Sequence, residues 1–247
     1  MSASRVVVRV VGAIGAAGSL GAMLLALATG EALAAGAGTV THLSGTLSVV
    51  KPDGSIRILS QKSEVNAGDT LTTEKDSYAQ VNMIDGSSMT IRPNTRVKIE
   101  EYNFVVDKPQ EDSAFYRLLR GGLRSVTGLV GKRGNQDAYR IGTATATIGV
   151  RGSSGDTLEC SEGCDGVSSS ADKLQKGLYH TTYTGSYVLT NTSGEQVIGE
   201  GQFGFVKDAN SAPQILAGDP GLNLRDLPKW EVPVDKRGAA AADCAVR

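Results

Sequence analysis

The chain has 247 residues and is almost neutral, with 25 Lys and Arg residues against 26 Asp and Glu residues. A chain without a basic excess lacks the usual electrostatic footprint of nucleic-acid binding, so no nucleic-acid partner is expected. Aromatic residues make up only 5% of the chain while glycines number 31, which favours short strands and tight turns over large helices.

The first 34 residues have the three parts of a secretory signal peptide. Arg5 and Arg9 form a basic start, an uncharged apolar segment runs from Val10 to Ala28, and Ala32-Leu33-Ala34 supplies the small residues of a cleavage site. We expect cleavage after Ala34, which would leave a periplasmic or secreted protein. A retained membrane anchor is the alternative, because roughly 20 apolar residues can also span a bilayer. No later segment is long and apolar enough for a stable membrane span.

Short strands are predicted from Thr39 onward, because apolar residues recur at every second position in short runs. Val81, Met89 and Val97 mark three such runs with turn sequences between them. Strands lying side by side, or coiled one above another, satisfy this pattern. The sequence therefore predicts an all-β fold in a β-solenoid-like or β-sandwich arrangement.

One stretch, from Glu111 to Arg120, is predicted to be helical. Phe115, Leu118 and Leu119 have a helical spacing, and Gly121-Gly122 follows as a stop signal.

A short pattern occurs twice, once near each end of the predicted strands. Ser44-Gly45 and Thr184-Gly185 each precede an alternating apolar run, and a second glycine follows nine residues later at Gly54 and Gly194. This repetition predicts two β-hairpin-like units on either side of a central section.

Cys160 and Cys164 lie four positions apart in a polar loop. In an exported protein such a pair is expected to form a local disulfide. A zinc site would need further ligands, and the chain has two histidines and no second cysteine pair of this kind. Cys244 is left over in an Ala-rich tail, either free or bridged to another chain.

Five motifs follow one another in the central part of the chain. They are Ala-Gly-Asp-Thr-Leu-Thr-Thr at 67–73, Ala-Gln-Val-Asn-Met-Ile-Asp-Gly-Ser at 79–87, Met-Thr-Ile-Arg-Pro-Asn-Thr at 89–95, Leu-Arg-Gly-Gly-Leu-Arg at 119–124 and Thr-Ala-Thr-Ala-Thr-Ile-Gly-Val-Arg-Gly at 143–152. Their order and spacing resemble the FecR-domain family. The resemblance implies an extracytoplasmic FecR-like domain behind a signal peptide, without the anti-sigma segment that precedes this domain in the founding regulators.

The predicted organisation has four parts. They are the signal peptide at 1–34, the FecR-like β domain at 39–165, a C-terminal β repeat unit packing on it at 166–210, and a flexible tail at 211–247, Pro-rich and then disordered.

The predicted function is a non-enzymatic module that binds an envelope protein or glycan in signalling or scaffolding, without a cofactor. Residues 117–140 are locally basic and suit an acidic partner, although such clusters are often only solvated faces. Arg151, beside Gly152, could hold a carboxylate or phosphate, or form an internal ion pair. The possible partner-binding residues are Arg117, Arg120, Arg124, Lys132, Arg133 and Arg151.

Two alternative functions remain open. A carbohydrate-active or peptide hydrolase of the cell envelope would use Asp85, or Glu100 and Glu101, as acid and base. A self-assembling structural β protein would join along open strand edges. The Gly68-Asp69 and Asp85-Gly86 turns are expected to be structural and not calcium sites, because the chain has no D-x-D-x-D-G loop.

Overall fold

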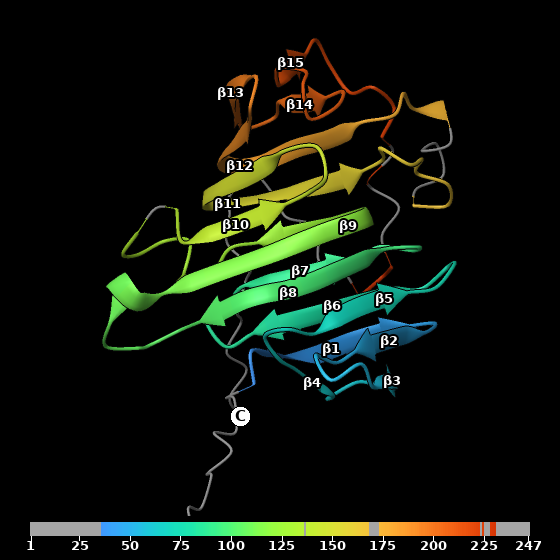
Figure 1. The fold of residues 1–247 in the computed structure, drawn as a ribbon, viewed down its shortest axis with the longest axis vertical. Coiled ribbons are helices and arrows are strands. Elements are labelled where there is room, and N and C mark those ends of the chain that lie inside the picture. The colour runs from blue at the N-terminus through green and yellow to red at the C-terminus, as the bar shows by residue number, and fades with distance from the viewer. Residues whose placement is uncertain (1–35, 136, 168–172, 223, 225–227, 231–247) are drawn as a thin grey trace, which may run out of the picture. The chain divides into compact units, whose positions relative to one another are not determined.

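The computed structural model describes residues 36–135, 137–167, 173–222, 224 and 228–230 (Figure 1). The predicted signal peptide, Cys244 and the end of the predicted flexible tail, residues 231–247, lie outside the described residues. Within the described ranges, no helix has the length and apolar character needed to cross a membrane.

The predicted all-β class is confirmed. Among the described residues, fifteen strands join in one mixed sheet, and the chain also forms a short 3-10 turn, η1 (Pro109–Glu111). Three long strands pass through the middle of the sheet, and each has two halves with different neighbours. These strands are β9 (Ser113–Val126), β11 (Thr147–Glu159) and β12 (Leu178–Asn191).

The first layer contains the first half of β9, the first half of β11 and the second half of β12. Its order is β3-β2-β5-β8-β9-β10-β11-β12-β13. Its other strands are β2 (Leu47–Val50), β3 (Ile56–Leu59), β5 (Thr70–Thr73), β8 (Arg96–Asn103), β10 (Tyr139–Gly142) and β13 (Gly194–Gly199).

The second layer contains the remaining halves of the three long strands. Its order is β4-β1-β6-β7-β9-β11-β12-β14-β15. Its other strands are β1 (Gly38–Ser44), β4 (Glu64–Val65), β6 (Tyr78–Met83), β7 (Ser88–Ile91), β14 (Phe203–Val206) and β15 (Gln214–Leu216).

Glycines mark the places where the long strands pass from one layer to the other. Gly121, Gly152 and Gly185 have φ values of +86°, +62° and +72°, a backbone conformation that favours glycine. At Gly121 an added Cβ would also lie 2.6 Å from the Cα of Thr95. These corners let one continuous sheet fold over into two layers.

The hydrophobic core lies between the two layers and takes buried side chains from both. Polar contacts also cross it: for example, the hydroxyl of Tyr102 on β8 donates to Asp85 at 2.9 Å, and Ser125 lies 3.2 Å from the hydroxyl of Tyr187. Of the two predicted arrangements, the structure is closer to a sandwich. Among the described strands, β9 and β10 pair in parallel, whereas the other pairings are antiparallel.

The predicted helix at 111–120 is wrong, because most of this stretch belongs to β9. Ala114, Tyr116 and Leu118 are fully buried and alternate with exposed or half-exposed side chains. Strands β8 and β10 flank this half of β9 and pair with its backbone. Tertiary pairing therefore decides the conformation of a stretch whose local apolar spacing suits either element.

The three runs marked by Val81, Met89 and Val97 do not all lie side by side. Strands β6 and β7 form an antiparallel hairpin, but β8 pairs with β5 and β9 in the other layer. The chain changes layers at the Pro93-Asn94 turn, where Asn94 has φ +53°.

The two copies of the glycine pattern have corresponding places in the fold. The chain changes layer at Gly45 and at Gly185, and a hairpin follows each corner, β2 with β3 and the end of β12 with β13. The two hairpins lie at opposite edges of the first layer (Figure 1).

The described part of the C-terminal segment packs on the second layer. Strand β15 pairs with β14, and Leu222 and Leu224 are buried in a second, smaller core. Further on, the ring of Trp230 stacks on His42 of β1 with centroids 5.1 Å apart. Within the described residues, the segment therefore contacts strands near both edges of this layer.

Candidate functional site

The outer faces of the two layers are the candidate functional surfaces. The second layer's outer face carries the smaller core, formed by Leu158, Tyr179 and Phe205 with the Cys160–Cys164 loop and the C-terminal leucines. On the first layer's outer face, charged side chains such as Arg140 are exposed. The two faces therefore offer different possibilities for binding.

The centre of the exposed face is an aromatic ring flanked by two guanidinium groups. Phe115 on β9 is half-buried, and the guanidinium carbons of Arg117 and Arg140 lie 5.3 and 5.2 Å from its ring centroid. The ring lies close to Gly142 of β10, where an added Cβ would meet the ring edge at 2.9 Å. The missing side chain of Gly142 thus leaves room for Phe115 to lie against the sheet.

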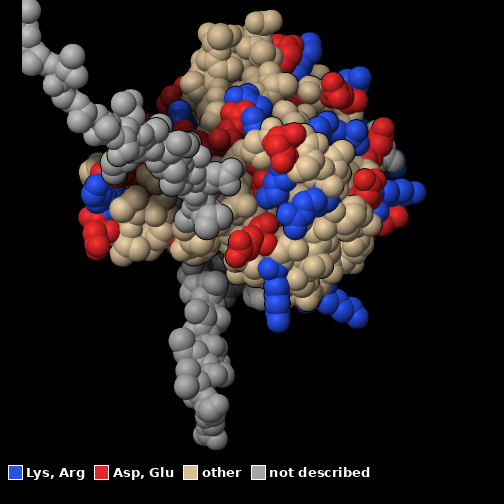
Figure 2. Space-filling view, turned by 60° about the horizontal axis from the view of Figure 1, so that its bottom comes forward, with Lys and Arg blue, Asp and Glu red and all other residues tan. Residues whose placement is uncertain are grey.

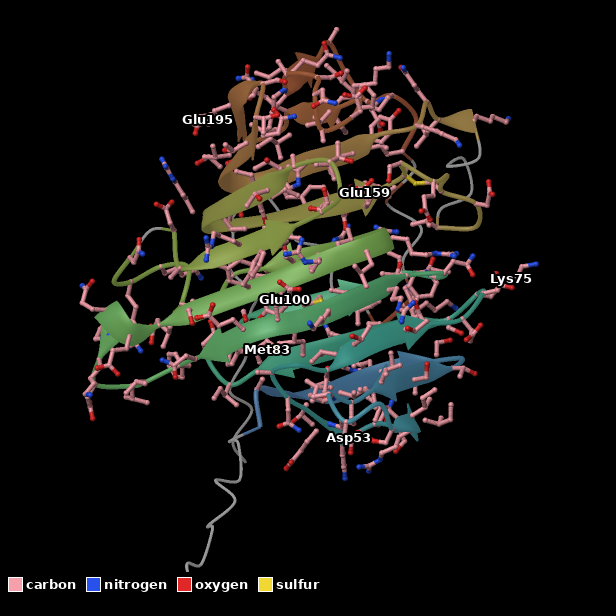
Figure 3. All side chains as sticks on the ribbon, in the orientation of Figure 1. Asp53, Lys75, Met83, Glu100, Glu159 and Glu195 are labelled. Atoms are coloured by element: carbon pink, nitrogen blue, oxygen red, sulfur yellow. A yellow bond between two sulfur atoms is a disulfide. The ribbon has the colours of Figure 1, made fainter. Side chains whose placement is uncertain are left out.

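Glu100 on β8 completes this surface with a partly exposed ion pair (Figure 3). Arg117 donates to its two carboxylate oxygens at 2.9 and 3.0 Å, and Lys98 lies 3.7 Å from it. The hydrogen bond from Arg117 lowers the pKa of Glu100. This pair holds the Arg117 guanidinium beside the Phe115 ring.

Three other predicted binding residues lie at the surface. Arg120 borders two adjoining polar hollows of about 140 and 240 Å³, and its Nε donates to the carbonyl of Asn94 at 3.1 Å. Lys132 and Arg151 are exposed, and the stem of Lys132 lies beside Gly152. In the end view of Figure 2, basic and acidic side chains lie side by side.

The last two predicted binding residues, Arg124 and Arg133, are committed to contacts within the fold. Arg133 donates to Asp112 at 2.9 Å and to the carbonyls of Val105 and Val106 at 2.9 and 2.7 Å. Arg124 is only 5% exposed. The structure therefore does not bring all six residues together on one face.

Arg124 belongs to a buried polar cluster on the outer face of the second layer. Its Nη2 lies 2.9 Å from Asp156 and 3.2 Å from the hydroxyl of Tyr183, which donates to the same carboxylate. Arg92, which is fully buried, lies 3.3 Å from Asp156. Burial alone would raise the pKa of Asp156, but the Arg92 and Arg124 guanidiniums hold it below its usual value.

Sequence reasoning missed Arg92, Asp156 and Tyr183. Sheet register brings Arg92 and Asp156 beside Arg124. Asp156 on β11 is a direct partner of Arg124 on β9, and so is Thr90 on β7, which Arg92 follows by two positions. Arg92 stands in the Arg-Pro-Asn-Thr motif, which the sequence identifies only as a turn. The one signal for this cluster in the sequence is that an arginine and an aspartate stand in or beside predicted strands.

His180 is buried between the layers and bonds to Thr157 through Nδ1 at 3.0 Å. Burial lowers its pKa to about 3, so the ring is neutral at physiological pH. Its ring lies 4.1 Å from that of Tyr187. These contacts suit a structural side chain.

The carboxylates considered for hydrolysis point in different directions. Asp85 is 3% exposed and accepts hydrogen bonds from Ser87, Tyr102 and the backbone N–H of Val130. Glu100 instead lies on the outer face of the first layer. Asp85 and Glu100 therefore do not form an acid and base pair with each other.

Cys160 and Cys164 form the predicted disulfide, with their Cα atoms 4.8 Å apart. Both residues belong to the smaller core. Over the residues that the structure describes, no three His, Cys, Asp or Glu side chains gather as a group that could hold a metal ion.

The central part of the chain matches a known protein family. Residues 69–165 match the family described as FecR protein, a range that runs from the start of β5 to the loop after β11. No curated protein matches the chain.

Two solved structures of a protein from Parabacteroides distasonis, described as an anti-sigma factor, are 13% and 12% identical to the chain, each with a TM-score of 0.43. Each match covers 61% of this chain and 60% of that one. A cell surface anchoring domain is 23% identical, with a TM-score of 0.25, over 26% of this chain and 84% of its own. These structural likenesses are too weak to carry an argument about function. The family match shows that residues 69–165 are similar to the FecR protein family.

Proposed function

We propose that this FecR-domain protein is a non-enzymatic signalling module of the cell envelope that binds an acidic partner protein through the outer face of its first layer. The family match supports a role in envelope signalling, because FecR domains are the extracytoplasmic parts of signalling proteins. An extracytoplasmic location also suits the Cys160–Cys164 disulfide, since disulfides persist in oxidising compartments.

The observation that carries the proposal is Phe115 between Arg117 and Arg140. Arginine and aromatic side chains are enriched among residues that dominate binding energy at protein interfaces. Gly142 lies on the same face and leaves room for the ring against the sheet. Lys98 and Arg151 extend the basic character, which favours acidic partners and speeds their association.

Photo-crosslinking in cells of the native host tests the proposal. A photoreactive amino acid at Thr147, an exposed position paired with Gly142, lies on the surface without replacing any of its three central residues. We expect a discrete protein adduct from Thr147 that disappears when Arg117→Glu and Arg140→Glu are combined. Lys75, in the turn between β5 and β6, is the matched control position and should give no such adduct (Figure 3).

Two results would contradict this binding surface. One is an adduct from Thr147 that survives both charge reversals, and the other is the same adduct from Lys75. An adduct that resists protease and is removed by glycosidase would identify a glycan and reject the protein partner.

Self-assembly is a second candidate, favoured by the edge strand β3. Among the described strands it pairs only with β2, and Ile56 and Ile58 are each 71% exposed. An exposed apolar edge strand can pair with another chain. Light scattering over a range of concentrations should show association that Ile58→Lys abolishes, and a monomer at every concentration would reject this candidate.

A further inference from the structure

The C-terminal segment occupies the outer face of the second layer in the way that a bound peptide would. Leu222 and Leu224 are 1% and 5% exposed within the smaller core. The ring of Trp230 lies parallel to that of His42, with an angle of 8° between their planes. The contacts are thus apolar side chains and one stacked ring.

One main-chain group of this segment meets the buried polar cluster. The carbonyl oxygen of Leu224 accepts hydrogen bonds from Nη2 of Arg92 at 2.8 Å and from Nη2 of Arg124 at 3.4 Å. Guanidinium groups bind carboxylates in a bidentate manner, whereas this carbonyl offers a single oxygen. The segment therefore places a neutral acceptor where the site suits an anion.

Arg92 retains unused donors at this position. It is fully buried, and its Nε and Nη1 atoms have no hydrogen-bond partner in the described structure. A buried charged donor without a partner costs free energy. A ligand with a second oxygen beside that of Leu224 would relieve this cost.

We propose that the outer face of the second layer is a binding site for an extended peptide of another protein, with Leu-x-Leu followed directly by a carboxylate. Leu222 and Leu224 are the built-in occupants of this site and block it until a partner displaces them. The two leucine side chains would fill the places of Leu222 and Leu224, and the carboxylate would engage Arg92. This site is separate from the first-layer surface, so the failure of one proposal leaves the other standing.

The tethered segment competes with any free peptide for this site, and so weakens the apparent affinity of that peptide. A tethered segment acts at an effective concentration on the order of millimolar, so a peptide with the same contacts competes poorly. A carboxylate adds a charge-assisted hydrogen bond that the Leu224 carbonyl lacks. Such bonds contribute about 1.5–3 kcal/mol, which corresponds to about 10–100-fold in affinity.

The experiment uses the full chain, with a protease site introduced at Gly218. This residue is exposed, and no heavy atom lies within 4 Å of the position of an added Cβ. The protein is folded and then cut, and labelled peptides spanning residues 217–224 are added. One peptide ends in a free carboxylate at Leu224, the second ends in an amide, and a third has a scrambled sequence.

We expect the free-acid peptide to bind the cut protein saturably, at least about tenfold more tightly than the amide. The uncut protein should bind it far more weakly. Trp230 is the only tryptophan of the chain, so its fluorescence should report release of the segment from His42. Equal affinities for the acid and the amide, binding of the scrambled peptide, or unchanged Trp230 emission at saturation would overturn the proposal.

A substitution then tests the role of Arg92. Arg92→Lys keeps the charge but removes the planar fork, and we expect it to abolish the preference for the acid. Arg96→Lys, at an exposed position of β8, is the matched control and should keep the preference. If Arg92→Lys does not fold, the comparison of acid and amide on the unsubstituted protein still decides the question.

Discussion

The outer faces of the two layers each carry an ion pair between an arginine and a carboxylate, but the two pairs differ in exposure. In the first layer Arg117 pairs with Glu100, and their side chains are 39% and 24% exposed. In the second layer Arg124 pairs with Asp156, and their side chains are 6% and 0% exposed. The same ion pair is therefore accessible to partners on one face and part of the packed structure on the other. The packing over each face, and not the type of residue, decides how exposed its ion pair is.

The largest expected difference between the faces follows from removing one carboxylate. Asp156→Asn leaves two buried guanidiniums without their shared carboxylate, which should lower the free energy of unfolding by about 3–5 kcal/mol. Glu100→Gln, the matched change on the exposed face, should lower it by about 1 kcal/mol or less. Urea denaturation of both variants measures the difference, and equal losses would break the comparison.

Apolar contacts should differ between the faces in the same direction. Leu222→Ala removes a 1% exposed side chain from the smaller core, so we expect a loss of about 2–5 kcal/mol in the free energy of unfolding. Ile58→Ala, on the exposed edge strand, should change it by about 0.5 kcal/mol or less. A similarly small effect at Leu222 would mean that the C-terminal segment contributes little to the fold.

The pH dependence of stability sharpens the contrast between buried and exposed groups. The pKa of His180 is about 3 in the folded protein, below the ordinary value of 6.5, so its proton binds preferentially to the unfolded chain. Its contribution to stability is complete above pH 6.5 and is lost as the pH falls toward 3, by at most about 1.4 kcal/mol per pH unit. His180→Gln should flatten this slope between pH 4 and 6.5 in urea denaturation. An unchanged slope in the variant would assign the effect to other groups.

The smallest expected effect on stability concerns Gly142. An added Cβ would meet the far edge of the Phe115 ring at 2.9 Å, and the half-exposed ring can move aside. Gly142→Ala should therefore change the free energy of unfolding by about 0.5 kcal/mol or less. The crosslink from Thr147 should nevertheless decrease, because the ring leaves its position between the two arginines. Gly149→Ala, whose Cβ would have only ordinary contacts at 3.9 Å, is the control and should keep the crosslink.

Local patterns predicted the strands but not their assignment to layers. The alternation that begins at Val81, Met89 and Val97 correctly indicates that every second side chain in these runs is buried. It cannot show that β8 leaves its sequence neighbours, because pairing with β5 and β9 depends on distant parts of the chain. The spacing of apolar residues at 111–120 suits either a helix or a strand. Pairing with β8 on one side and β10 on the other selects the strand. The Cys160–Cys164 disulfide was predictable because its two ends are close in sequence.

The candidate site was harder to predict for the same reason. Arg117 and Arg124 look alike in sequence, seven positions apart on one strand. The corner at Gly121 places them on different layers, and only the three-dimensional pairings show that Arg124 meets Asp156. The sequence therefore predicted a basic surface, but the exposure of each arginine side chain in the fold decides which of them can belong to it.

The central strand β9 has a consequence for how the protein folds. It exchanges backbone hydrogen bonds with β7, β8, β10 and β11, which come from both layers and from both sides of it in sequence. Neither layer can complete its ladder before this strand is in place, and its partners are the two strands before it and the two strands after it in sequence. The two layers should thus form together, without a stable intermediate in which one layer stands alone.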